Sequence, residues 1–143
     1  MKKIFLDANI IIDLLDSASK DHAVAVSSLQ IIRQHFGKPA VSPATFLIVN
    51  YLLGKFVKNK QWHKKQMQLT FSAFEMTPIQ PSFIEKAFQG HFTDLEDSLQ
   101  YQCALYAKAR VILTKDIKDY FESKIPVVHP DDFVNRYNNL LPR

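Results

Sequence analysis

"RVILTKDIKDYF", residues 110–121, joins an apolar run to a polar segment that carries two aspartates. The aliphatic residues of 110–114 predict a short buried strand. Asp116 and Asp119 follow that strand at once, and in parallel α/β sheets ligands bind beyond the carboxyl ends of the strands. A charged turn after a strand is also an ordinary feature of proteins that bind nothing. The stretch alone therefore leaves open whether these acids belong to a site.

Other short apolar runs of the chain resemble this one. "KKIFL", residues 2–6, stops at Asp7, and further candidate strands cover 39–43, 74–79 and 125–129. Apolar residues at helical spacing fill the segments between them, over 10–16, 22–36, 44–57, 58–74, 82–90, 95–109 and 130–141. Strands that alternate with helices indicate a parallel sheet. We expect an α/β fold: one three-layer domain over 1–143, with a central parallel sheet flanked by helices.

The helix expected over 44–57 differs from the others in composition. Ser42 is a suitable N-cap, and Pro43 suits the first helical position. "ATFLIVNYLLGKFV" is apolar nearly all round, which predicts a buried helix. Asn50 is its only strongly polar residue.

Composition limits the functional classes. The 143 residues carry 18 Lys+Arg and 14 Asp+Glu, giving a net charge of +4, which tolerates a polyanionic partner without requiring one. Lysines gather around Trp62, and we expect RNA contacts from Lys58, Lys64, Lys65 and Lys115. A solvated helix end is the simpler interpretation of that run. The histidines lack zinc-site spacing, and no phosphate-loop or serine-hydrolase motif occurs.

The sequence also predicts a compartment. Cys103 is the single cysteine, lies in an apolar run and is expected to be a small buried residue. Asp7 and Asp13 interrupt the apolar start, which argues against a leader peptide. No apolar run approaches the roughly 20 residues that span a bilayer. We expect a cytoplasmic protein without a membrane segment.

Carboxylates mark the predicted edge of the sheet. Asp7 and Asp116 each follow a strand and should meet at the same edge. Asp94 and Asp97 share one face of the helix that follows them, because they are three positions apart, whereas Glu96 should point elsewhere. Two carboxylates about 5 Å apart repel by roughly 3 kcal/mol at an effective dielectric near 20. Such a cluster requires protonation or a cation, and oxygen ligands suit Mg²⁺ or Mn²⁺.

Three quoted segments resemble the PIN-domain family, the ribonuclease fold of VapC-type toxins. They are "IFLDANIIIDLL", "DLEDSLQYQCALYAKARVILTKDIKDYF" and "IPVVHPDDFV", and the resemblance covers nearly the whole chain. It implies that Asp7, Asp97 and Asp116 are catalytic and bind metal, with Asp94 and Asp119 as further metal-site acids. It also implies a metal-dependent endoribonuclease acting as the toxin of a toxin–antitoxin pair, with RNA as substrate and a small antitoxin as partner. A homodimer is a further assembly left open.

Two positions beside these acids fit the family pattern, and one helix departs from it. Asn9 and Thr114 are expected to support the carboxylates. The family usually carries a Glu on the helix after the second strand, where residues 44–57 have no acid. We assign that place to Asn50, with Thr45 the poorer candidate. A buried Asn that hydrogen-bonds within the core is the alternative.

The missing Glu keeps other functions open. One is a non-catalytic PIN-like module that binds RNA or protein. Another is a phosphoacceptor domain built around Asp7, which would need a lysine after a later strand. Lys115 fits the role of that lysine poorly.

Overall fold

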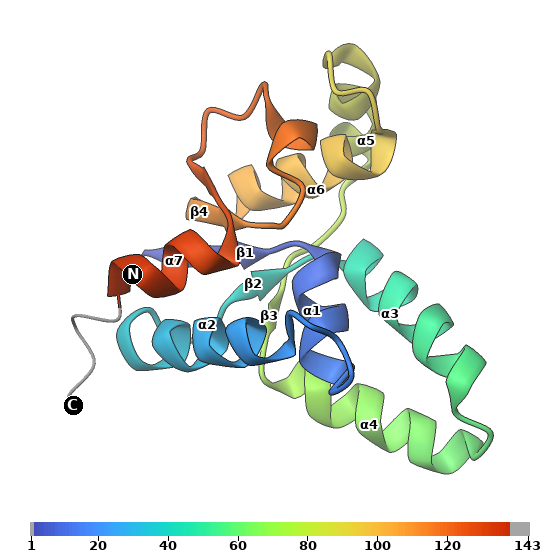
Figure 1. Cartoon of the computed structure of the whole chain (residues 1–143). Coiled ribbons are helices and arrows are strands. Elements are labelled where there is room, and N and C mark those ends of the chain that lie inside the picture. Colours follow the sequence, from blue (N-terminus) through green and yellow to red (C-terminus); the bar gives the residue numbers. More distant parts are fainter. Residues whose placement is uncertain (1, 138–143) are drawn as a thin grey trace.

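Five short strands form the central sheet in the order β3-β2-β1-β4-β5, and every neighbouring pair is parallel. β1 (Lys3–Leu6) lies in the middle, between β2 (Ala40–Val41) and β4 (Ala109–Leu113). β3 (Glu75–Met76) and β5 (Val127–Val128) form the edges. The computed structural model describes residues 2–137 (Figure 1). The predicted parallel sheet is confirmed.

Helices cover both faces of this sheet. Their bounds are α1 (Ala8–Leu15), α2 (His22–His35), α3 (Pro43–Phe56), α4 (Lys60–Ser72), α5 (Pro81–Gln89), α6 (Leu95–Tyr106) and α7 (Pro130–Tyr137), with a 3-10 turn, η1 (Ile117–Tyr120). The expected segments match these helices closely. Residues 138–141 of the last expected helix lie outside the described residues.

Successive side chains of β1 point to opposite faces of the sheet and contribute to two separate core layers. Ile4 and Leu6 point into one cluster, together with side chains of α1, α2, α3, α4 and α7. Phe5 points the opposite way, into a cluster with α5, α6 and η1. Successive side chains of a strand face opposite sides of a sheet, so a strand buried on both faces reads as a continuous apolar run. Figure 1 shows α5 and α6 on one side of the strands and α1, α2 and α7 on the other. The three-layer prediction is confirmed.

The expectation that α3 is buried is wrong. Only Thr45 and Val49 of this helix are buried, whereas the exposed fractions of Leu47, Tyr51 and Phe56 are 65%, 63% and 83%. A helix that packs on one side buries a single stripe, and here its other faces are apolar as well. A large exposed apolar surface of this kind is typical of a site that binds another molecule.

Two smaller predictions concern single features. Cys103 is fully buried between α6 and the sheet, as expected. Within residues 2–137, no helix has the length and apolar character needed to cross a bilayer.

Candidate active site

Asp7 is the most buried acid of the site. It ends β1 and caps α1, where its Oδ1 accepts a hydrogen bond of 2.7 Å from the Ala8 N–H. The Thr114 hydroxyl donates to Oδ2 at 2.8 Å, and the Gln100 amide donates to Oδ1 at 3.3 Å. Burial raises the pKa of Asp7, and these hydrogen bonds oppose that rise because they favour the carboxylate. Asp7 is therefore fixed in position by neutral donors.

Asn9 connects the ends of β1 and β4. Its Nδ2 lies 3.3 Å from Asp7 Oδ2, 3.1 Å from Asp116 Oδ2 and 3.1 Å from Thr114 Oγ1. The Lys115 N–H donates to Asn9 Oδ1 at 3.2 Å. One amide thus reaches both strand-end carboxylates, so the structure brings Asp7 and Asp116 together as the sequence suggested.

The start of α6 adds the other predicted acids. Asp94 caps the helix and accepts hydrogen bonds from the N–H groups of Glu96 at 2.7 Å and Asp97 at 3.3 Å. Burial, followed in decreasing order by the negative charges of Asp7, Asp94, Asp119 and Glu96, raises the pKa of Asp97 to about 7. These side chains therefore share one electrostatic environment. Of the predicted acids, Asp7, Asp94 and Asp119 lie close enough to Asp97 for their charges to raise its pKa.

Glu96 is exposed, but it lies near enough to Asp94 and Asp7 for their charges to act on it. Burial raises its pKa, and so do the charges of Asp94 and Asp7. Side chains of a helix tilt toward its N-terminus, so those of the first turn hang over the helix end. At this end of the helix, the charges of residues i and i+2 can therefore act on one another even though the two side chains start on different faces.

A neutral network connects α3 to Asp7. Gln100 is fully buried; its Nε2 donates to Thr45 Oγ1 at 2.8 Å as well as to Asp7, and its Oε1 accepts from the Ser42 hydroxyl. Sequence reasoning did not name Gln100, and it named Ser42 only as a helix N-cap, a role that the structure confirms. The signal for Gln100 was its position three residues after Asp97, on the same helix face.

Asn50 does not join the site. Its side chain is exposed, and its Oδ1 lies 2.7 Å from His63 Nε2 of α4. Five helical positions separate Thr45 from Asn50, a rotation of about 140° at 3.6 residues per turn, so both cannot face Asp7. The preference for Asn50 over Thr45 was wrong.

Tyr120 is a second residue that sequence reasoning missed. Its ring is buried, and its hydroxyl has no hydrogen bond of good geometry to a described residue. Burial raises its pKa well above the usual value, followed by the negative charges of Asp7 and Asp97. The phenol therefore keeps its proton, and it is available as a donor beside the two acids.

The predicted RNA-binding lysines do not surround the acids. Lys115 Nζ lies 2.6 Å from Asp13 Oδ2 and 3.2 Å from Asp21 Oδ2, so two carboxylates already engage it. Lys58 lies in the α3–α4 connection, and Lys64 and Lys65 lie on α4. Figure 1 shows that connection at the end of α3 remote from its start. Because α3 starts beside Asp7 and its 14 residues extend about 21 Å, this group lies away from the cluster.

The donor chemistry of the cluster fits a hard divalent cation. All of the acids offer oxygen, and they repel one another, as the raised pKa of Asp97 shows. Within residues 2–137, no group of three or more His, Cys, Asp or Glu is already close enough to hold one ion. Mg²⁺ does not need such a group, because it keeps several waters and uses one or two carboxylates. Asp7 together with Asp97 or Asp116 would supply two carboxylates.

Comparisons with known proteins agree with this fold. Residues 3–118 match the PIN domain family. Ribonuclease VapC1 of Aquifex aeolicus (strain VF5) is 28% identical over 144 residues, which cover 97% of this chain and 98% of that protein. The chain therefore belongs to the PIN-domain family.

Solved structures show the same fold at low sequence identity. A toxin–antitoxin complex from Klebsiella pneumoniae contains a chain with a TM-score of 0.67 and 22% identity, covering 90% of this chain and 98% of that one. DNA-bound VapBC from Salmonella typhimurium gives a TM-score of 0.68 at 14% identity, covering 91% and 99%.

Proposed function

We propose that this protein is a metal-dependent endoribonuclease that hydrolyses RNA phosphodiester bonds in the cytoplasm, as the toxin of a toxin–antitoxin pair. The observation that carries the proposal is the cluster around Asp97, whose pKa is raised to about 7 by burial and by neighbouring acids. Perturbed acids of this kind gather at functional sites. The 28% identity to a protein named ribonuclease VapC1 supports RNA as the substrate.

The proposed roles follow from the contacts of each residue. Asp7, Asp97 and Asp116 would hold Mg²⁺ or Mn²⁺, with Asp94 and Asp119 nearby. The bound ion would lower the pKa of a water and neutralise charge on the phosphate. The neutral donors described above keep Asp7 oriented, and Asn9 sets the spacing between Asp7 and Asp116.

Cleavage of mixed RNAs by the purified protein tests the proposal. We expect cleavage in Mg²⁺ or Mn²⁺, none in EDTA, and none by Asp7→Asn in either metal. Asp132→Asn is a matched control, because Asp132 is an exposed acid on α7. This variant should cleave RNA like the wild type. Cleavage that persists in EDTA or in Asp7→Asn would reject the metal-dependent mechanism.

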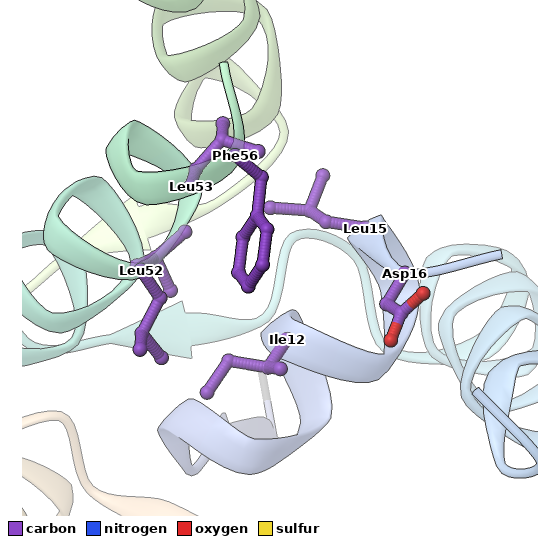
Figure 2. A pocket seen from close by; sticks show the side chains of 7 residues that line it. Ile12, Leu15, Asp16, Leu52, Leu53 and Phe56 are labelled. Carbon is purple, nitrogen blue, oxygen red and sulfur yellow. The ribbon is translucent and has the colours of Figure 1, made fainter. Parts of the chain in front are cut away.

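An apolar groove offers a place for the antitoxin. It lies between α1 and α3, has a volume of about 360 Å³ and is lined by Ile12, Leu15, Asp16, Val49, Leu52, Leu53 and Phe56. Figure 2 shows the Phe56 ring directed toward α1 and the Asp16 carboxylate at the rim. Phe56 is 83% exposed, so much of this apolar surface is without cover.

We assign the groove to an apolar segment of the antitoxin that carries a basic residue for Asp16. The similar chains from Klebsiella pneumoniae and Salmonella typhimurium come from a toxin–antitoxin complex and from VapBC, which supports a partner of this kind. Both walls of the groove start at the acidic cluster, α1 at Asp7 and α3 at Ser42. A segment lying in the groove is therefore directed along the helices toward the site.

Leu53→Asp tests the groove, because it places a charge where the apolar segment would lie. We expect a small protein that inhibits RNA cleavage by the wild type to inhibit Leu53→Asp at least about tenfold less well, since burying an unpaired charge costs more than 1.4 kcal/mol. Uninhibited cleavage rates of the two proteins should agree. Equal inhibition of both would place the antitoxin elsewhere.

One observation favours a second function, a non-catalytic module. The side chains that reach Asp7 from α3 and from the middle of α6 are neutral: Thr45 contacts Gln100, and Gln100 contacts Asp7. The charge of the family's usual Glu is thus absent from this position. RNA binding without cleavage in any divalent metal would support the module.

A further inference from the structure

We propose that the exposed ring of Phe121 stacks on an unpaired base of the RNA, beside the acidic cluster. The inference rests on the proposed function and names the form of RNA that the site takes: a single strand or a loop, in place of a duplex.

The ring of Phe121 is both exposed and supported. It is 63% exposed, and its centroid lies 6.5 Å from that of Phe92. Phe92 in turn stacks on Tyr101 at 5.2 Å with an interplanar angle of 28°, and meets Tyr120 edge-on at 6.1 Å. Phe92 therefore supports the ring of Phe121 on the side that faces the protein, and Tyr101 and Tyr120 in turn hold Phe92. The outward face is left to solvent.

The residue that precedes Phe121 lies beside the acids. Tyr120 directs its hydroxyl to the neighbourhood of Asp7 and Asp97, and it directly precedes Phe121 in the chain. A shallow hollow of about 330 Å³ occupies the preceding turn, and it is lined by Lys115, Asp116, Ile117, Lys118 and Asp119. A nucleotide beside the cluster can thus place its base on Phe121 and its phosphate near this hollow.

Two lysines lie near Phe121 in the sequence, together with two acids, Asp119 and Glu122. Lys118 and Lys124 are exposed, three positions on either side of Phe121. Lysines position a phosphate backbone without reading its sequence, and an aromatic ring between them binds a base through its face. Trp62, by contrast, is 49% exposed but lies on α4, away from the acids.

The stacking geometry selects unpaired RNA. In a duplex each base is covered above and below by its neighbours, so a protein ring reaches a base face only where the strand is open. Base–aromatic stacking tolerates any base, because every base has a π-face. We therefore expect preference for open strands with little preference among bases at this position.

Fluorescence anisotropy with a short labelled single-stranded RNA tests the inference. All proteins carry Asp97→Asn, so that the RNA survives the measurement. Against this reference, Phe121→Ala should bind roughly 5- to 100-fold more weakly, and Phe121→Trp should retain the affinity. Tyr51→Ala is the matched control, because Tyr51 is also a 63% exposed aromatic but lies in the second half of α3.

An abasic scan of the same RNA locates the stacked base. One abasic position should weaken binding to the reference protein and have no further effect on Phe121→Ala. The labelled RNA in duplex form should bind the reference and Phe121→Ala alike. Additive losses at every abasic position, or equal losses for Phe121→Ala and Tyr51→Ala, would overturn stacking while leaving the nuclease proposal intact. Failure of the wild-type chain to bind or cleave any RNA would instead reject the proposed function, and the inference with it.

Discussion

Asp97→Asn should lower metal-dependent RNA cleavage by more than about a hundredfold, which is the upper end of the loss caused by changing a residue outside the metal's own ligands. The protein should stay folded, because Asp97 makes no side-chain hydrogen bond that supports α6 among the described contacts; Asp94 caps that helix. Replacing Asp97 removes one charge from a self-repelling cluster, so the metal-free protein should be no less stable.

The pH dependence of stability gives this prediction a second measurement. The pKa of Asp97 in the folded protein is about 7, above its ordinary value of 3.8, so the folded state holds this proton more tightly than the unfolded chain does. Its contribution to the free energy of unfolding is fully present below pH 4 and is lost as pH rises through 7. Urea titrations without metal should therefore show wild-type stability falling over that range, with a shallower fall in Asp97→Asn. A large loss of stability with unchanged cleavage would make Asp97 a structural residue.

Lys115→Met should lower the free energy of unfolding by about 2 to 4 kcal/mol. Asp13 is 5% exposed and has the Lys115 ammonium at 2.6 Å, so removing that cation leaves a buried carboxylate without its charge partner. The expected loss is below that of a fully buried pair because the Lys115 side chain is 28% exposed. Chemical denaturation measures it directly.

Two controls identify the cause of that loss. Asp13→Asn combined with Lys115→Met should recover part of the stability, because the unpaired charge is then gone. Lys118→Met, at an exposed lysine of the same turn, should change stability by less than about 0.5 kcal/mol. If Lys115→Met were as stable as wild type and bound RNA less well, Lys115 would return to the RNA-binding role that the sequence suggested.

The fold was predictable because each strand is a short apolar run buried on both faces. Ile4, Phe5 and Leu6 fill both core layers, and no helical pattern fits such a run. Asp7 and Asp116 were predictable for a related reason, since the ends of parallel strands meet at one edge. The exposure of most of α3 was not predictable, because an apolar sequence alone does not distinguish a helix buried in the core from one with an exposed apolar surface.

The remaining site residues depend on tertiary contacts that no local pattern encodes. Gln100 lies in a stretch that reads as an ordinary amphipathic helix, and only folding places its amide between Asp7 and Thr45. The charge of Lys115 suggested phosphate binding, but the turn before α2 brings Asp21 to it and α1 brings Asp13. A sequence shows which residues carry charge, and the fold decides which charges are already paired.

Anomalous diffraction from crystals soaked in Mn²⁺ tests most directly whether the acids share a divalent cation. We predict a manganese peak in contact with Asp7 and at least one of Asp97 and Asp116, and its loss in crystals of Asp7→Asn. Wild-type crystals with no peak at the ends of β1 and β4, while cleavage continues in the same buffer, would contradict a metal-dependent site at these carboxylates.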